Sequence, residues 1–257
     1  MRVHPTAFVD PAARLGEGAE IGPFCVVGPE VVLGAGVTLK AHVVVQGDTA
    51  IGEGTVVFPF AVLGEVPQDL KYAGERTRLR IGARNRIREH VTMNLGTAGG
   101  GGETRVGDDG LFMAGAHVAH DAQVGDRVVV ANSAAIAGHC VIGDDAVLGG
   151  LCGIHQWVRI GRGAMIGALA MVTHDVIPFG LVQGPRGELE GLNLVGLRRR
   201  GVPREEIHDL RSAFEDLRTG AGPFQARAAM LRDRGPLARE VAEFVLSASD
   251  RQFLAPR

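Results

Sequence analysis

Residues 124–148 read VGDRVVVANSAAIAGHCVIGDDAVL, with an apolar residue at every sixth position. The same period covers most of the chain, and its apolar positions are Val9, Leu15, Ile21, Val27, Leu33, Leu39, Val45, Ile51, Val57, Leu63, Ile81, Ile87, Met93, Val106, Phe112, Val118, Val124, Val130, Ile136, Ile142, Leu148, Ile154, Ile160, Ile166 and Val172. A period of six fits neither an α-helix, at 3.6 residues, nor an alternating strand. It is typical of a hexapeptide solenoid, in which a narrow β-coil stacks on itself.

The repeat predicts an all-β fold, a parallel β-helix over residues 1–190. Three sides of six residues make a triangular turn of 18 residues, and successive turns stack about 4.8 Å apart. The periodic side chain points inward, and the small residue that often follows it is expected to ease the bend. The rule for crossover connections favours a right-handed coil, whereas the hexapeptide families that the repeat resembles are left-handed.

The composition excludes several classes of protein. The 38 glycines among 257 residues are periodic, so they indicate structure rather than disorder. A net charge of −2 gives no basic excess for nucleic acid. No apolar run reaches the roughly 18 residues of a transmembrane helix, and the opening MRVHPTAFVD is no signal segment. We therefore expect a cytoplasmic protein with no nucleic-acid partner and no transmembrane segment.

The repeat is interrupted first at residues 65–80, EVPQDLKYAGERTRLR. The anchors Leu63 and Ile81 are 18 positions apart, so the phase of the six-residue repeat is kept. The anchor positions between them, however, hold Asp69 and Glu75, which cannot fill an apolar core. The segment is therefore expected to bulge outward as a loop. Loops on a rigid scaffold commonly carry function, and the clustered polar side chains favour that interpretation over a tolerated insertion.

A second interruption, at residues 94–104, contains the glycine-rich run GTAGGGGET. Its flanking anchors, Met93 and Val106, are one position further apart than two repeats. We therefore predict that the segment contains one extra residue. A functional loop and a tolerated insertion are equally consistent with this segment.

The periodicity ends near Pro178, and residues 191–257 are predicted to form an α-helical C-terminal domain. From about residue 203, apolar side chains recur at helical spacing, at Ile207, Leu210, Phe214 and Leu217. Residues 224–234 and 237–249 are predicted as two further helices. A domain this small has little core of its own, so it should pack on the coil or on another subunit.

Turns of this length place positions 120, 138 and 156 on one edge of the prism, and histidines gather there. His120 is joined by His139 one turn along and by His155 two turns along, with His117 on the same side and His174 a further turn away. None holds an inward apolar position, which argues against simple core packing. A solvated histidine ladder, a metal site and a catalytic base are the alternatives.

Asp121, directly after His120, favours the catalytic base, because a nearby carboxylate can orient or polarise it. Adjacent residues of a strand point to opposite faces, so the two side chains meet only if the backbone turns there. The metal alternative rests on proteins resembling the γ-class carbonic anhydrases, which bind zinc between subunits through three histidines. Two of those ligands are closely spaced, and this spacing is absent here, so no metal ligand is predicted.

Five segments closely resemble those of the UDP-N-acetylglucosamine O-acyltransferase family: GEVPQDLKYAGE (64–75), NRIREHVTMNLGT (85–97), AHVAHD (116–121), GLCGIHQ (150–156) and GLNLVGLRRRG (191–201). The resemblance covers essentially the whole chain and implies a left-handed coil. It also implies transfer of an (R)-3-hydroxyacyl group from acyl carrier protein to the 3-hydroxyl of UDP-N-acetylglucosamine, the first step of lipid A biosynthesis. A homotrimer with sites between neighbouring coils is implied, with no cofactor besides the carrier's phosphopantetheine.

The resemblance also assigns roles to residues of this chain. His120 matches the general base, Asp121 would support its imidazolium form, and the Gly138 N–H would help to hold the developing oxyanion. The positions that match substrate contacts are Gln68, Asp69, Lys71, His117, His139, His155, Gln156, Asn193, Arg199 and Arg200. For the two arginines, the alternative is an exposed basic run in a helical tail.

Ala168 matches the residue that ends the acyl groove, where Gly admits long chains, so a shorter chain is predicted. Residues 94–97 and Val195 depart from the family pattern, which leaves a 3-amino analogue of the sugar as an alternative acceptor. The rival functions are an N-acyltransferase of the same pathway, a coenzyme A-dependent acetyltransferase and a non-enzymatic scaffold. The N-acyltransferases carry an additional N-terminal domain, which we do not expect here because the repeat begins at Val9.

Overall fold

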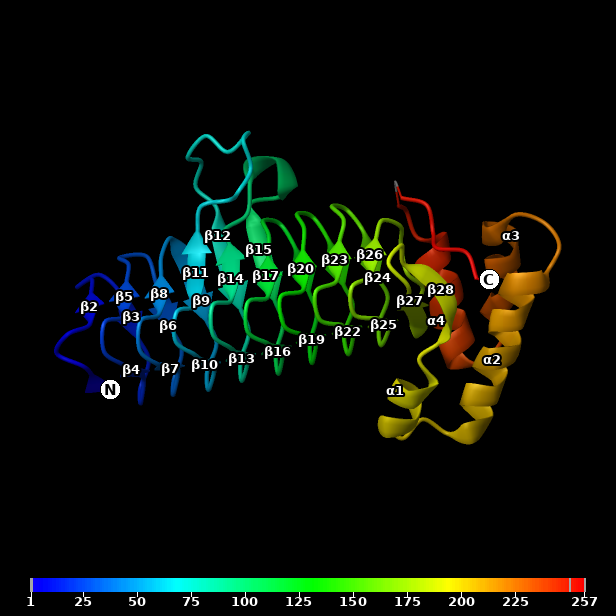
Figure 1. The fold of residues 1–257 in the computed structure, drawn as a ribbon, viewed down its shortest axis with the longest axis horizontal. Coiled ribbons are helices and arrows are strands. Elements are labelled where there is room, and N and C mark those ends of the chain that lie inside the picture. Colours follow the sequence, from blue (N-terminus) through cyan, green and yellow to red (C-terminus); the bar gives the residue numbers. More distant parts are fainter. Residues whose placement is uncertain (1, 250, 257) are drawn as a thin grey trace.

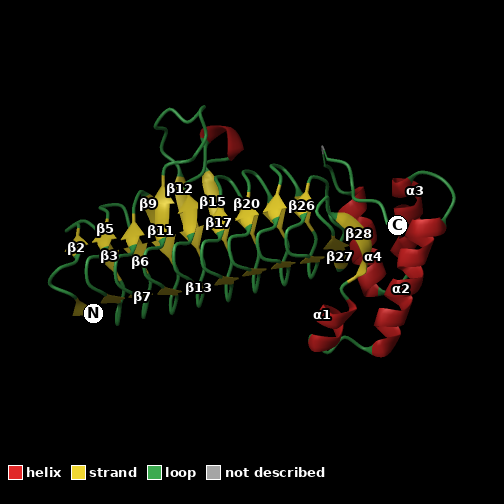
Figure 2. Cartoon of the chain, in the orientation of Figure 1, coloured by secondary structure: helices red, strands yellow, loops and turns green. Residues whose placement is uncertain are grey.

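The computed structural model, which describes residues 2–249 and 251–256, is an elongated three-sided prism with helices at its C-terminal end (Figure 1). Strands of mostly two residues alternate with tight corners along the prism. Helices occur at the C-terminal end and in one short turn above the prism (Figure 2). The predicted all-β parallel β-helix is confirmed.

Three sheets form the sides of the prism. Sheet A contains β1 (Arg2–Val3), β4 (Glu20–Ile21), β7 (Thr38–Leu39), β10 (Val56–Val57), β13 (Arg86–Ile87), β16 (Leu111–Phe112), β19 (Val129–Val130), β22 (Val147–Leu148), β25 (Met165–Ile166), β27 (Gly180–Gln183) and β28 (Glu188–Leu192). Sheet B contains β2 (Phe8–Val9), β5 (Val26–Val27), β8 (Val44–Val45), β11 (Val62–Glu65), β14 (Thr92–Asn94), β17 (His117–Val118), β20 (Ala135–Ile136), β23 (Gly153–Ile154) and β26 (Met171–Val172). Sheet C contains β3 (Arg14–Leu15), β6 (Val32–Leu33), β9 (Asp48–Ile51), β12 (Arg78–Ile81), β15 (Glu103–Val106), β18 (Gln123–Val124), β21 (Val141–Ile142) and β24 (Arg159–Ile160).

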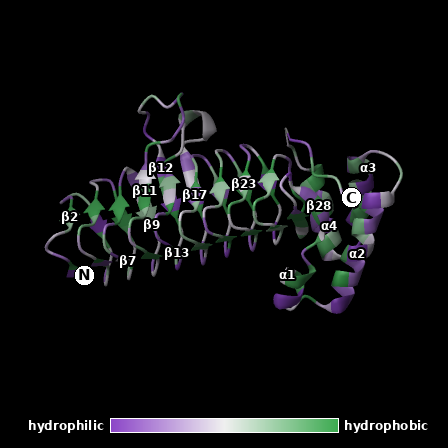
Figure 3. Cartoon of the chain, viewed as in Figure 1, coloured by the Kyte–Doolittle hydropathy of each residue, from purple (hydrophilic) through white to green (hydrophobic). Residues whose placement is uncertain are grey.

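The register of the sheets steps by one turn at a time. Val129 pairs in parallel orientation with Val147, which lies one turn further along the chain. In each two-residue strand, the second residue is an inward anchor. Val130 and Leu148 are examples, and both are fully buried. Figure 3 shows hydrophobic residues recurring along the strands of the prism. The core is therefore a continuous apolar column that grows by one layer per turn.

The corners correct one expectation about small residues. The backbone turns with positive φ three residues after an anchor, as at Asp121 (φ 59°) and His139 (φ 62°), yet residues with large side chains often occupy this position. The glycine directly after an anchor has another role. A Cβ on Gly149 would lie 2.6 Å from the backbone nitrogen of Ala168 in the next turn, so these glycines permit the close approach of turns.

Both interruptions of the repeat leave the prism at the same corner, between sheets B and C. The first joins β11 to β12, and the second joins β14 to β15 through a short 3₁₀ helix, η1 (Ala98–Gly100). Met93 and Val106 therefore lie on adjacent sides, where a single repeat would suffice. The 13 positions between them exceed that single repeat by seven, so the prediction of one extra residue is wrong. The loops protrude together above the prism (Figure 1).

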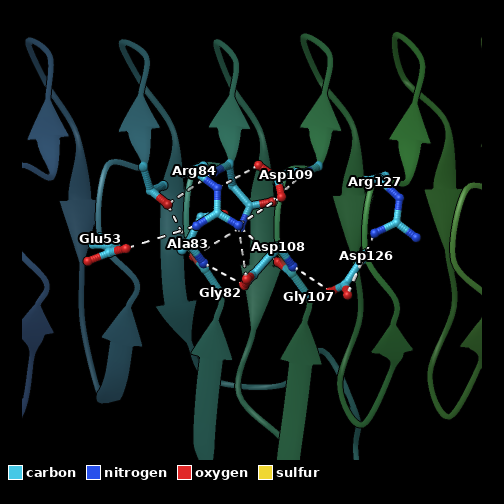
Figure 4. Close-up of polar contacts among 12 residues, drawn as sticks. Glu53, Gly82, Ala83, Arg84, Gly107, Asp108, Asp109, Asp126 and Arg127 are labelled. Atoms are coloured by element: carbon cyan, nitrogen blue, oxygen red, sulfur yellow. Dashed lines mark hydrogen bonds and ion pairs between the residues drawn. The ribbon is translucent and has the colours of Figure 1, made fainter.

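The edge between sheets C and A carries a ladder of charged side chains (Figure 4). Arg84 Nε donates to Asp109 Oδ1 over 2.8 Å, and this hydrogen bond lowers the pKa of the Asp109 carboxyl. Carboxylates also join successive turns, because Asp108 Oδ1 accepts from Ala83 N and Asp126 Oδ1 accepts from Asp108 N, both over 2.8 Å. Exposed ion pairs stabilise a protein little, so the ladder chiefly satisfies corner N–H groups.

The coil ends in a hairpin that the repeat did not predict. After β26 the chain forms β27 and turns back antiparallel into β28. The helices that follow are α1 (Leu194–Arg199), α2 (Arg204–Thr219), α3 (Phe224–Ala229), the 3₁₀ helix η2 (Met230–Asp233) and α4 (Pro236–Leu246). The helix predicted over 224–234 is thus divided in two, and that over 237–249 ends at Leu246.

Apolar side chains of the C-terminal helices close the end of the prism. Leu210 and Phe214 of α2 and Val241 of α4 line a small apolar space with Ile177 and Leu192 of the coil and hairpin. Among the described residues, no helix combines the length and hydrophobicity needed to cross a bilayer.

Asn85, fully buried at a corner, provides a test of how turns are joined. Its amide donates to the carbonyls of Gly82 (3.0 Å) and Gly107 (2.8 Å), and its oxygen accepts from Gly110 N over 2.8 Å. Asn85→Ala leaves these buried groups unpaired, so the free energy of unfolding should fall by about 2–4 kcal/mol. Urea denaturation measures this, with exposed Asn132→Ala as a control, and a loss below about 1 kcal/mol would contradict the bridging role.

Candidate active site

His120 and Asp121 lie at the corner that follows β17 in sheet B. The positive φ of Asp121 turns the backbone, and His120 Nδ1 comes within 2.9 Å of Asp121 Oδ2. Both residues are buried, with 4% and 3% of their surface exposed. An ionised carboxylate only accepts, so Nδ1 donates to it and the lone pair of the neutral imidazole lies on Nε2. The backbone turn that the two side chains need in order to meet is therefore present.

The glycine-rich loop wraps around the Asp121 carboxylate. Thr97 donates twice, from its N–H to Oδ1 (2.8 Å) and from its hydroxyl to Oδ2 (2.6 Å). A Cβ on Gly100 would overlap the carboxylate, which explains why the loop needs glycine there. Sequence reasoning missed the role of Thr97, although the run of glycines beside it was the available signal.

His139 and Trp157 continue the same edge. The His139 ring stands perpendicular to that of His120, with centroids 4.9 Å apart, and stacks on Trp157 at 3.8 Å. Burial lowers the pKa of His139, partly opposed by the negative charge of Asp121. Trp157 is half-exposed and was not among the predicted site residues. The sequence did offer one indication of its role: Trp157, the single tryptophan of the chain, is one turn after His139.

The remaining histidines of the edge have separate environments. His117, on the outer face of sheet B, has Nδ1 2.7 Å from Thr92 Oγ1, and burial lowers its pKa. His155 is exposed and lies beside exposed Gln156, two turns along from His120. His174, with Nδ1 2.9 Å from Thr173 Oγ1, is half-buried.

The loop after β11 reaches the histidine edge. A pocket of about 410 Å³ is lined by Asp69, Lys71, Tyr72, Glu75, Thr97, Ala98, Gly99, His139 and Trp157. Glu75 ties the two loops together, because its carboxylate accepts from the N–H groups of Ala73 and Ala98, and these bonds lower its pKa. Gln68 is exposed on the same loop and does not line the pocket. A hollow of about 470 Å³ beside α2 contains none of the predicted site residues.

Four predicted residues lie on other edges of this chain. Asn193 Nδ2 donates to the Gly163 carbonyl over 2.9 Å, on the edge between sheets C and A. Arg200 also lies against Gly163, and burial lowers its pKa, while Arg199 belongs to the same helix end. Ala168 is exposed at the edge between sheets A and B. One chain alone does not bring these residues to His120.

His120, Asp121 and His139 also present ligand-type atoms within 4.8 Å of one another, as a metal site would require. The Asp121 carboxylate, however, already accepts from Thr97 and His120 through both oxygens. A cation would have to displace these hydrogen bonds. The arrangement therefore fits a hydrogen-bonded acid–base pair better than a metal centre.

Similarity to known proteins agrees with this geometry. Residues 175–253 match the family model described as UDP-N-acetylglucosamine O-acyltransferase, domain 2, and residues 12–47 and 139–174 match the bacterial transferase hexapeptide model. The chain is 52% identical to the acyl-(acyl-carrier-protein)--UDP-N-acetylglucosamine O-acyltransferase of Caulobacter vibrioides, over 100% of this chain and 98% of that protein.

The chain belongs to the UDP-N-acetylglucosamine O-acyltransferase family.

A Paracoccus denitrificans member of the family is 69% identical over 78% of this chain and 77% of its own length. A crystal structure of UDP-N-acetylglucosamine acyltransferase superposes with a TM-score of 0.96 at 39% identity, and the Campylobacter jejuni enzyme with 0.94 at 35%, each over 100% of both chains. This similarity confirms the left-handed β-helix of the acyltransferase family.

Neighbouring glycines of the loop around Asp121 give a matched test. A Cβ at Gly100 would overlap the carboxylate, whereas a Cβ at Gly99 meets open space. Gly100→Ala should therefore displace residues 94–104 and raise their amide hydrogen exchange by about tenfold or more, while Gly99→Ala leaves exchange unchanged. Equal exchange in the two variants would show that the loop does not depend on its contact with Asp121.

Proposed function

We propose that this protein transfers an (R)-3-hydroxyacyl group from acyl carrier protein to the 3-hydroxyl of UDP-N-acetylglucosamine, the first step of lipid A biosynthesis. Its family membership supports the reaction class, donor and acceptor. The observation that carries the mechanism is the buried His120–Asp121 pair, in which Nε2 of the imidazole has no hydrogen-bond partner among the described residues. We also propose that the enzyme acts in the cytoplasm, as expected from the sequence.

His120 acts as the general base. Its Nε2 takes the proton of the sugar 3-hydroxyl while that oxygen attacks the thioester carbonyl. The new C–O bond forms, the C–S bond breaks, and the imidazolium returns its proton to the sulfur of the carrier's phosphopantetheine. Asp121, held by Thr97, stabilises the imidazolium through Nδ1. The chain itself needs no cofactor or metal for this sequence.

Gly138 supplies the oxyanion contact. Within the described residues its N–H has no hydrogen-bond acceptor, although the residue is buried. A Cβ at this position would lie 2.5 Å from His120 Cε1, so only glycine lets the imidazole pack against the backbone. An unpaired buried donor beside the base is what a developing oxyanion requires.

The substrate site is shared between chains of a homotrimer. A prism edge is convex, and Asn193, Arg199 and Arg200 lie on a different edge from His120, so a cleft needs a second coil. An exposed stack of Phe24, His42, Phe60 and His90 supports assembly, with ring centroids 5.0–5.1 Å apart. Phe24 and Phe60 expose 56% and 48% of their surface, which favours burial against another copy.

Polar residues around His120 contact the nucleotide sugar in this proposal. Asp69 and Lys71 share a pocket with His139, and Gln68 lies on the same loop. His117, His155 and Gln156 extend the site along the edge, and the paired arginines suit the diphosphate.

Replacement of the base tests the mechanism. His120→Ala should lower kcat by about 10²–10⁴-fold, because a positioned general base contributes that much. The assay uses 3-hydroxyacyl carrier protein with UDP-N-acetylglucosamine, and in parallel with its 3-amino analogue, which decides between the two acceptors. Exposed His4→Ala is the control, and circular dichroism checks folding. Near-normal turnover of a folded His120→Ala protein would overturn the assignment.

Ala168 is proposed to limit acyl-chain length. Its methyl group projects at an exposed corner, where the groove for the hydrocarbon should end. Ala168→Gly should shift the ratio of kcat/KM toward the longer donor by roughly tenfold for a two-carbon step, and Ala168→Val should shift it the other way. Rates over a series of 3-hydroxyacyl carriers measure this, and an unchanged preference in both variants would exclude Ala168 as the ruler.

A further inference from the structure

The C-terminal tail returns from α4 to the end of the coil. Asp175 N donates to the Gln252 carbonyl (2.8 Å), and Leu254 N donates to the Asp175 carbonyl (2.9 Å). Phe253 lies between these contacts and packs near Phe224 and Phe244, with ring centroids 5.7 and 6.1 Å apart. The tail is therefore attached to the prism through its backbone and an aromatic cluster.

A buried carboxylate fixes the same tail. Asp175, which is fully buried, accepts from Arg159 through Nε (2.7 Å) and the backbone N–H (2.8 Å). Ser249 also donates its hydroxyl to this carboxylate (2.7 Å), and the same hydroxyl oxygen accepts from Arg251 N (3.1 Å). These bonds set the backbone position of Arg251.

Arg251 reaches the histidine edge from this position. Its Nη2 is 3.0 Å from His155 Nδ1 and 2.8 Å from the Gln156 carbonyl oxygen. A guanidinium group only donates, so Nδ1 must accept and the neutral His155 must carry its proton on Nε2. Without Arg251, Nδ1 lies 3.2 Å from the same carbonyl and would hold the proton to donate to it. Arg251 therefore selects the tautomer.

We propose that Arg251 is a positioning residue of the active site, which fixes His155 as an Nε2–H donor to an oxygen of the nucleotide sugar. The inference rests on the proposed function, which places His155 and Gln156 in the substrate site. A nucleotide sugar is rich in acceptor oxygens, so an imidazole that presents Nε2–H binds it better than one that presents a lone pair. The tail thus contributes to acceptor binding rather than to proton transfer.

The tautomer can be read directly. The ¹⁵N NMR spectrum of ¹⁵N-histidine-labelled protein is recorded at pH 8. Comparison with the spectrum of His155→Gln identifies the His155 signals among those of the other histidines. Wild-type protein should show an unprotonated Nδ1 and a protonated Nε2. Arg251→Met, which keeps an apolar stem for packing, should shift His155 toward the Nδ1–H form, whereas Arg251→Lys, also a pure donor, should retain Nε2–H.

Kinetics supply the second measurement. Arg251→Met should raise KM for UDP-N-acetylglucosamine about tenfold, the loss expected for one hydrogen bond to the substrate, with kcat nearly unchanged. Arg251→Lys should keep most of the affinity. Exposed Arg232→Ala, in the same C-terminal domain, is the control for loss of a positive charge.

An unchanged tautomer in Arg251→Met overturns the proposal, and so does a changed tautomer with an unchanged KM. Failure of the proposed function has a different signature. Wild-type protein would then acylate no UDP-N-acetylglucosamine, although the tautomer of His155 would still respond to Arg251→Met.

Discussion

The stacking of one three-sided turn on the next is the constraint on which the rest of the structure depends. Backbone hydrogen bonds between turns allow no slip, because a shift of one residue would expose every anchor to solvent. Residues one turn apart are therefore held in columns, and side chains far apart in sequence acquire fixed neighbours. His120 packs against Gly138 for this reason, and His139 stacks on Trp157.

One corner concentrates the departures from this regularity. Both insertions leave the prism between sheets B and C, where His120 and Asp121 lie. A rigid coil can extend there without disturbing its core, since the anchors on either side keep their layers. The added loops then supply what a convex edge lacks: Thr97 for the carboxylate, and Asp69 and Lys71 for a pocket.

The sequence predicted the features that follow from the six-residue period, and few of the contacts made by the loops and the C-terminal tail. The length of the turn was enough to place His120, Gly138 and Gln156 on one edge, because the register is periodic. The loop at 94–104 was misjudged, since spacing alone does not show on which side of the prism Val106 lies. Thr97 and Arg251 were missed because their contacts depend on loop and tail conformations that no repeat specifies.

Two histidines of the same edge show how such added contacts set chemistry. His120 meets an anion at Nδ1, so it holds the proton there and presents a lone pair at Nε2, as a base must. His155 meets a cation at Nδ1, so its proton moves to Nε2 and it presents a donor, as a binding residue must. The coil supplies equivalent positions, and the charge of the group beyond Nδ1 suits one histidine to the base role and the other to the donor role that we propose for them.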